Sequence, residues 1–175
     1  MKTLLVIIAA VVGVVLLIAV VIAIVGSRLP KEHTATRSIL LQQSPLNVYA
    51  VIRDFGSAPT WRSDVKRMEV ENQPEGKTHF REQGSNGTVN YELAEDVPGQ
   101  RLVTKILDTD LGYSGKWTYE LIPENNGTRV RITEDGEVSN VLFRFMSRYV
   151  FGQTATLDAY LTALAKRFGE DAKPS

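Results

Sequence analysis

The chain has 175 residues, with 20 basic and 20 acidic side chains and a formal net charge of zero. This length fits one domain of ordinary size once a membrane or targeting segment is set aside. Balanced charge without a basic cluster argues against a nucleic-acid partner, because nucleic-acid binders carry clustered Lys and Arg. The sequence has no cysteine, which excludes disulfides, thiolate metal sites and a cysteine nucleophile but leaves the compartment open.

The segment from Thr3 to Gly26 contains no charged residue and is long enough to cross a hydrocarbon core of about 30 Å as a helix. A cleavable signal peptide is the competing interpretation, but its apolar core would span only about 7–15 residues. We therefore predict an uncleaved, single-pass membrane anchor over residues 1–27. A short tether over residues 28–32 should follow it and hold the domain close to the bilayer.

The side of the membrane is less well determined. Lys2 precedes the apolar segment, whereas Arg28 and Lys31 follow it, so the positive-inside rule gives conflicting indications. We expect the domain outside the cytoplasm, because translocating the charged N-terminus on so short a tail is the less usual topology. The rest of the chain is slightly acidic, so we do not expect electrostatic recruitment to anionic lipid.

The first elements after the tether are a strand and a helix. The residues from Thr34 to Gln42 are apolar and β-branched enough for a strand. Ser44 and Pro45 then supply an N-cap and a proline at the first helical position. The pattern predicts a helix that ends at Gly56, followed by a short helical turn over residues 57–62.

Six strands with short connections should follow, which predicts an antiparallel meander. Along the fifth, Trp117 and Tyr119 alternate with polar residues, and Val130 and Ile132 do the same along the sixth, so one face of the sheet should be apolar. The predicted strands are Val65 to Asn72, Thr78 to Gly84, Thr88 to Asp96, Arg101 to Thr109, Lys116 to Pro123 and Thr128 to Val138.

The stretch from Val141 to Phe168 has apolar residues at i, i+3 and i+4 spacing, which predicts a long amphipathic helix that covers the apolar face of the sheet. The apolar stripe is interrupted at Gly152, Gln153 and Thr154. We expect a cavity at this gap, opposite the face that carries Trp117 and Tyr119. Alternatively, Gly152 breaks the run into two helices, with Thr154 or Thr156 capping the second.

This order of elements resembles the helix-grip fold of the START-like, polyketide cyclase/dehydrase and Bet v 1-like superfamily. The resemblance rests on TRSILLQQSPLNVYAVIRDFGSAPTW, on the pair GKWTYELIPENNGTRVRITEDGEV and on the terminal helix. It implies an α+β fold in which a curved antiparallel sheet wraps around a long C-terminal helix, here over residues 33–170 with a tail over 171–175. It also implies a cavity for lipids, sterols, polyketides or similar molecules. No set of cyclase catalytic residues maps onto this chain.

The candidate ligand-binding residues are aromatic or polar side chains expected to border the cavity. Each aromatic residue joins an apolar body to one hydrogen-bonding tip, which suits a ligand that is mostly hydrocarbon with a single polar group. Glu134 continues the inward register of Val130 and Ile132, and it either lies wet at the rim or binds a polar group of the ligand. The alternative for the aromatic residues is that they are simply core. The candidates are Tyr91, Trp117, Tyr119, Glu134, Tyr149, Gln153 and Thr154.

The remaining polar residues give weaker indications. His79 could form an acid/base pair with Arg81 or Glu82, but a surface position is the more common outcome; His33 beside the tether is interpreted as incidental. Two histidines so far apart make a metal site unexpected, and Asp108 and Asp110 are interpreted as part of a solvated turn. We predict no catalytic residues, no metal and no cofactor. Hydrolase and nucleotide-binding motifs are absent.

The sequence therefore predicts a membrane-anchored protein that binds a hydrophobic small molecule between the sheet and the C-terminal helix. Two other classes remain open. One is an aromatase/cyclase-type enzyme with ionisable groups in the cavity. The other is a protein-interaction module with a closed core and an exposed apolar patch. The oligomeric state is left open.

Overall fold

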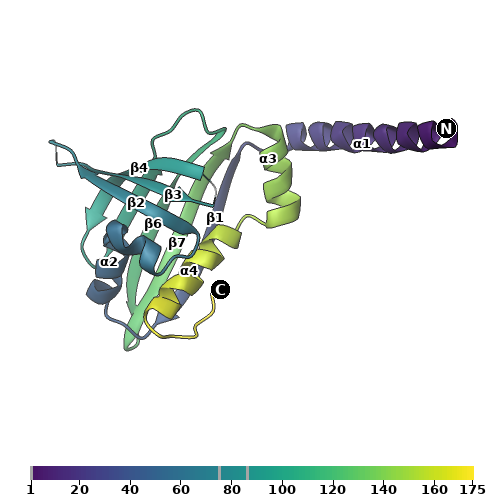
Figure 1. The fold of residues 1–175 in the computed structure, drawn as a ribbon. Coiled ribbons are helices and arrows are strands. Elements are labelled where there is room, and N and C mark those ends of the chain that lie inside the picture. The colour runs from purple at the N-terminus through teal and green to yellow at the C-terminus, as the bar shows by residue number, and fades with distance from the viewer. Residues whose placement is uncertain (1, 75, 86) are drawn as a thin grey trace.

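The computed structural model describes residues 2–74, 76–85 and 87–175, and the side chain of Phe151 lies outside the description. A long N-terminal helix projects from a domain in which a curved sheet packs around helices (Figure 1). The elements are α1 (Lys2–Arg28), β1 (Glu32–Leu41), α2 (Pro45–Arg53), η1 (Phe55–Thr60), β2 (Val65–Asn72), β3 (Thr78–Gly84), β4 (Gly87–Val97), β5 (Arg101–Ile106), β6 (Tyr113–Glu124), β7 (Gly127–Val138), α3 (Val141–Met146), η2 (Ser147–Phe151) and α4 (Ala155–Arg167).

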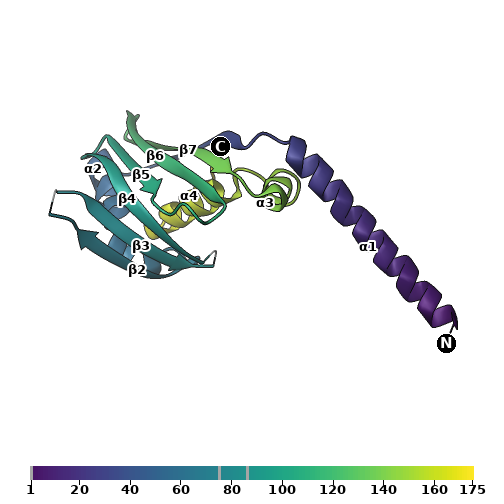
Figure 2. The same cartoon turned by 90° about the horizontal axis from the view of Figure 1, so that it is seen from above.

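The strands form one seven-stranded antiparallel sheet in the order β1-β7-β6-β5-β4-β3-β2. Strands β2 to β7 pair in sequence order, which confirms the predicted meander, and β1 closes the sheet beside β7. Ala35 on β1 and Trp117 on β6 both lie opposite Glu134 on β7, so these three side chains share the concave face. Figure 2 shows α2 and α4 lying within the curve of the sheet.

The helix before the meander begins as predicted, but it ends at Arg53 and not at Gly56, and the short helical turn that follows is η1. Ser44 caps α2 by accepting a hydrogen bond from the Asn47 amide, and Pro45 is its first residue. Val48 and Ile52 are buried against the sheet, four residues apart on one face. The α+β helix-grip fold is confirmed.

The core lies between the sheet and α4. Leu157, Leu161 and Leu164 are fully buried at spacings of four and three residues, which is the stripe that the sequence predicts. They pack with Ile39 and Ile132 on the sheet. Burying each such side chain stabilises the fold by roughly 1.5–3 kcal/mol. Helix α4, the second half of the segment predicted as the C-terminal helix, therefore packs against the sheet.

The prediction of one continuous helix from Val141 to Phe168 is wrong, and the alternative of two helices is confirmed. The π-helical η2 follows α3 directly, and Gly152 then adopts a φ of 79° and a ψ of 148°, which breaks the helix. Thr154 occupies the N-cap position of α4, but its side chain makes no capping hydrogen bond. Tyr149 and Val150 are exposed, so the first half of the run does not cover the sheet.

Helix α1 has 27 residues with a mean hydropathy of 3.5 in its most apolar window, and among the described residues it alone meets the length and composition needed to cross a membrane. Its side chains are exposed along its length, and Gly26 is its buried residue. At the other end of the chain, residues 171–175 return to β1. Ser175 exchanges two backbone hydrogen bonds with Ser38, each 2.9 Å long, and so pairs with the edge of the sheet.

Candidate functional site

Four aromatic rings meet where α4 crosses the concave face of the sheet. Trp117 and Tyr119 point inward from β6, and their ring centroids lie 5.7 Å and 5.6 Å from that of Tyr160 on α4. Trp61, just after η1, reaches the same ring at 5.4 Å in an edge-on arrangement. The structure therefore brings the predicted residues Trp117 and Tyr119 together. Tyr160 fills the space opposite them, where the sequence placed Gln153 and Thr154.

A partly buried ion pair lies against this cluster. The guanidinium of Arg62 donates to both carboxylate oxygens of Glu82, at 2.7 Å and 3.1 Å, and to Asp64 at 2.6 Å. The Arg62 and Glu82 side chains are only 14% and 19% exposed, and the guanidinium carbon lies 5.3 Å from the Tyr160 ring centroid. Burial lowers the pKa of Arg62, but Glu82 and Asp64 outweigh this effect and raise it overall.

Sequence reasoning missed this pair as part of the site. The available signal was the register of β3, in which Thr78, Phe80 and Glu82 alternate with outward residues, so a carboxylate had to face the interior. Its partner comes from the turn between η1 and β2, and sequence spacing does not reveal that contact.

Tyr91 belongs to a second aromatic group on the same face. Its ring stacks on Phe80 at 5.0 Å, and Phe80 stacks on Phe55 at 4.0 Å. Burial raises the pKa of the Tyr91 hydroxyl, and it does the same for Tyr119 and Tyr160, so all three remain protonated at neutral pH. The interior therefore presents hydroxyl groups rather than phenolates.

Glu134 meets His33 at the end of the sheet that lies next to α1. The two side chains lie 3.4 Å apart and are 22% and 14% exposed, respectively. The imidazole lies over Gly136, where a β-carbon would come within 2.4 Å of the ring. Burial raises the pKa of Glu134, although His33, Trp117 and Thr156 oppose the shift. His33, interpreted from the sequence as incidental, is thus the nearest ionisable neighbour of a predicted site residue.

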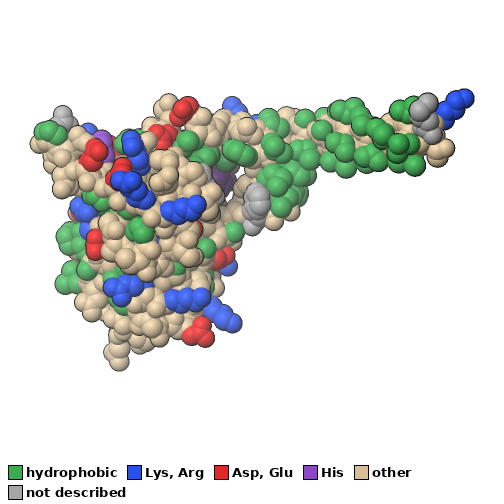
Figure 3. Space-filling view, viewed as in Figure 1, with side chains coloured by type: hydrophobic (Ala, Val, Ile, Leu, Met, Phe, Trp, Pro, Cys, Tyr) green, Lys and Arg blue, Asp and Glu red, His purple; other side chains and the backbone are tan. Residues whose placement is uncertain are grey.

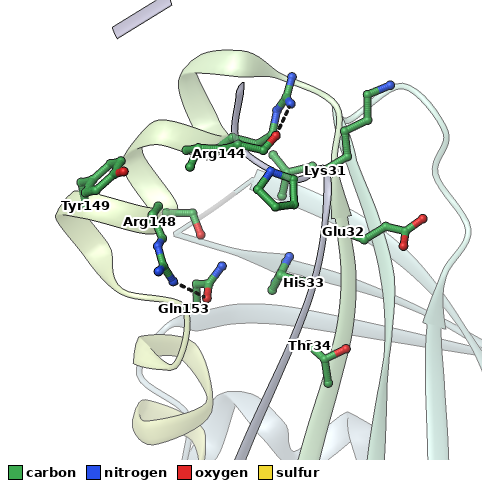
Figure 4. A pocket seen from close by; sticks show the side chains of 12 residues that line it. Lys31, Glu32, His33, Thr34, Arg144, Arg148, Tyr149 and Gln153 are labelled. Carbon is green, nitrogen blue, oxygen red and sulfur yellow. Dashed lines mark hydrogen bonds between the residues drawn. The ribbon is translucent and has the colours of Figure 1, made fainter. Parts of the chain in front are cut away.

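A cavity of about 390 Å³ opens beside His33 (Figure 4). Gln153 faces His33 across it, and Arg148 donates to the Gln153 side chain at 3.5 Å. The lining comprises Leu29, Pro30, Lys31, Glu32, His33, Thr34, Val138, Arg144, Ser147, Arg148, Tyr149 and Gln153. The predicted residues Tyr149 and Gln153 are therefore separated from Trp117 and Tyr119 and line a space at the end of α1. Thr154 does not line it.

The family model described as "Polyketide cyclase / dehydrase and lipid transport" matches residues 32–169. The chain belongs to this family. Among curated proteins no relative matches it.

Solved structures share the fold of this polyketide cyclase/dehydrase and lipid transport domain at low identity. A START superfamily protein from Mycobacterium smegmatis superposes with a TM-score of 0.64 at 15% identity, over 77% of this chain and 96% of that one. An aromatase/cyclase from Streptomyces sp. R1128 gives 0.61 at 13% identity, over 78% and 96%. Norcoclaurine synthase from Thalictrum flavum gives 0.61 at 12% identity, over 79% and 87%.

The weaker candidates lie outside the interior of this family domain. His79 faces Glu92 at 3.6 Å on the outer side of the sheet, and Arg81 donates to Asn90 there. Asp108 accepts hydrogen bonds from the amide and side chain of Asn90, both at 2.7 Å, so it holds the end of β5 to β4. Over residues 2–74, 76–85 and 87–175, no group of three His, Asp or Glu side chains is arranged to hold a metal ion.

Proposed function

We propose that this protein is anchored in the cell membrane by α1 and binds a hydrophobic small molecule, such as a lipid or a polyketide-like compound. The observation that carries the proposal is the position of the 390 Å³ cavity, which lies where β1 leaves the anchor. Its volume falls within the range of about 300–1,000 Å³ typical of small-molecule sites. The description of the family, which includes lipid transport, supports this class of ligand.

The lining suggests a ligand with a hydrocarbon body and one anionic or polar end. Leu29, Pro30 and Val138 supply apolar surface, and Lys31, Arg144 and Arg148 supply cations against the single carboxylate of Glu32. Arginine and lysine side chains pair with carboxylate or phosphate groups. A fatty acid or an acidic phospholipid has this combination of groups.

In this proposal the anchor is residues 1–27, the tether is residues 28–32, the domain is residues 33–170 and the tail is residues 171–175. We place the domain on the extracytoplasmic side, for the topological reason given above. Labelling a Val70→Cys variant on intact cells with an impermeant maleimide tests this side, since Val70 is exposed on β2 and the chain has no other cysteine. Labelling only after the cells are opened would place the domain in the cytoplasm.

Native mass spectrometry of the full chain, released from detergent micelles after incubation with palmitate or phosphatidylglycerol, tests binding. We expect one probe molecule per chain. Gln153→Phe should reduce the affinity about tenfold, or ~1.4 kcal/mol, because the ring occupies part of the cavity. Gln83→Phe on the outer face of β3 is the matched control. Failure of the wild-type chain to hold either probe would remove the binding function, and equal binding by all three chains would move the site elsewhere.

An aromatase/cyclase-type enzyme is the second candidate, and the polar interior favours it. The Nε1 of Trp61 and the Nε of Arg62 are buried donors without a hydrogen-bond partner among the described residues. Glu134, with its raised pKa, is a carboxyl suited to donate a proton. Incubation with a linear poly-β-ketone thioester and analysis by mass spectrometry tests this function. A dehydrated product that disappears in Glu134→Gln would support it, and an unchanged substrate would argue against it.

A further inference from the structure

Four apolar side chains of the α3–η2 segment, Val141–Phe151, lie on the outside of the molecule. Leu142, Phe143, Tyr149 and Val150 are 48–59% exposed. Their spacing of i, i+1, i+7 and i+8 puts them on one stripe of a helix. Among the other described residues of the domain, the exposed large apolar side chains are Leu46, Val70 and Leu107, which lie on three different parts of the chain. The cluster is therefore a surface that needs a partner.

The side of the same segment that faces the protein carries a buried arginine. Arg144 is buried, and its guanidinium donates to the carbonyl of Leu29 at 2.9 Å and to that of Ser139 at 3.4 Å. An amphipathic helix on a soluble domain normally turns its apolar stripe inward and its arginines outward. Here Arg144 points inward while four large apolar side chains point outward, which is typical of a helix whose apolar stripe contacts lipid.

Contacts with α1 fix the position of the segment. A β-carbon on Gly26 would lie 2.5 Å from the Val141 carbonyl oxygen, so α3 packs directly on the last turns of α1. The hydrogen bond from Arg144 to Leu29 adds a second attachment just beyond the end of α1. In both Figure 1 and Figure 2, α3 lies across the end of α1 rather than along it. Figure 3 shows the apolar surface of α1 continuing onto this segment.

The length of α1 then sets the depth of α3. Its 27 residues span about 40 Å at 1.5 Å per residue, whereas the hydrocarbon core takes about 30 Å. With Lys2 and Arg28 in the two headgroup regions, Gly26, two residues before Arg28, lies at the boundary between acyl chains and headgroups. A helix packed crosswise at this level lies in the plane of the interface, where Phe and Tyr rings and snorkelling Arg side chains are favoured.

We propose that α3–η2 is an interfacial helix, embedded by Leu142, Phe143, Tyr149 and Val150 in the leaflet from which α1 emerges. This inference rests on the proposed membrane anchor. It also assigns a source of ligand, because Ser147, Arg148 and Tyr149 line the cavity and belong to the embedded segment. The mouth of the cavity therefore opens on the lipid headgroups, and the ligand enters from the leaflet rather than from water.

The test places single cysteines in the cysteine-free full chain, labels them with an NBD fluorophore and reconstitutes the protein in phosphatidylcholine liposomes. Val150→Cys and Leu142→Cys report on the proposed surface, Val14→Cys on the middle of α1, and Val70→Cys on an exposed site of β2. We expect lipids with a shallow doxyl group to quench the labels at Val150 and Leu142 strongly. Lipids with a deep doxyl group should quench the label at Val14, and the label at Val70 should respond to neither.

The outcomes separate the two proposals. Quenching at Val14 combined with labels at Val150 and Leu142 that behave like the label at Val70 would overturn the interfacial helix and leave the anchor standing. No quenching at Val14 would remove the anchor and the inference with it. Labels at Val150 and Leu142 that are shielded from both doxyl lipid and aqueous iodide would show a protein partner on this surface, which would also overturn the inference.

Discussion

Replacing Arg62 with methionine should leave the largely buried carboxylate of Glu82 without its partner. Glu82 is 19% exposed and loses two charged hydrogen bonds, of 2.7 Å and 3.1 Å. Breaking a buried pair by removing one partner costs about 3–5 kcal/mol. Because some water reaches Glu82, we expect the lower end, about 3 kcal/mol. Replacing both residues removes the unpaired charge, so Arg62→Met with Glu82→Met should be within about 1 kcal/mol of the wild-type protein.

Urea unfolding of the full chain in a non-ionic detergent measures these free energies, with the fluorescence of Trp61 and Trp117 as the signal, since both rings lie against Tyr160. At a slope of about 2 kcal/mol per molar urea, a loss of 3 kcal/mol lowers the midpoint by about 1.5 M. Arg67→Met is the matched control. Arg67 is 70% exposed beside Glu69, and such a surface pair contributes about 0–1 kcal/mol.

A double variant whose loss equals the sum of the two single losses would refute this reasoning, because it would show that Arg62 and Glu82 do not act as a buried pair. A stable double variant also allows a functional comparison. If the double variant folds but no longer retains palmitate or phosphatidylglycerol, the Arg62–Glu82 pair contributes to ligand binding and not to stability. Unchanged retention would confine the site to the cavity beside His33.

Three further changes separate burial, charge and backbone geometry. Leu161→Ala should lower the free energy of unfolding by about 2–5 kcal/mol, because this side chain is fully buried, whereas Leu46→Ala at a 62% exposed site should change it by less than ~0.5 kcal/mol. Glu134→Gln should flatten the pH dependence of stability. Burial raises the pKa of Glu134 above its usual 4.5, so the stability of the wild-type protein falls as the pH rises from about 4.5 through the folded-state pKa. Gly152→Ala should cost about 1–3 kcal/mol, because φ is 79°.

Urea midpoints measure all three changes, and for Glu134→Gln they are collected from about pH 4 to pH 7. No atom lies within 4 Å of a β-carbon at Gly152, so its cost comes from the backbone alone. Gly56→Ala, where φ is not positive, is the control and should be nearly neutral. Equal effects at Gly152 and Gly56 would contradict the assigned strain. A Glu134→Gln curve parallel to the wild-type curve would contradict the raised pKa, and a Leu161→Ala loss no larger than that of Leu46→Ala would contradict its role in the core.

The sheet could be predicted closely because its signals are local. Alternating residues and turn residues act over a few positions, so β2 and β3 have the predicted bounds, and β4 to β7 differ only at their ends. Pro45 and Ser44 likewise mark the start of α2 by their own backbone chemistry. Side-chain direction followed from the same alternation, which is why Trp117 and Tyr119 are found on the concave face.

The site could be predicted only in part, because its contacts join distant residues. His33 and Glu134 are about a hundred positions apart and meet only because β1 closes the sheet beside β7. Arg62 meets Glu82 through the turn that follows η1. Neither pair has a sequence spacing that identifies it. Gln153 was selected for a gap in the helical stripe and Tyr149 as an aromatic residue expected to border the cavity, and both line a different cavity from the one predicted.

The helical period shows which residues share a face of a helix, but it does not show whether that face contacts water, lipid or the protein interior. From Leu142 to Val150 and from Leu157 to Leu164 the sequence shows one kind of amphipathic pattern, yet the first stripe is exposed and the second is fully buried. Gly152 separates them, since its positive φ redirects the chain after η2. A continuous helix would carry both stripes onto the sheet. The break instead lets α4 pack on the sheet while α3 stays beside the end of α1, which is the arrangement that the proposed interfacial helix requires.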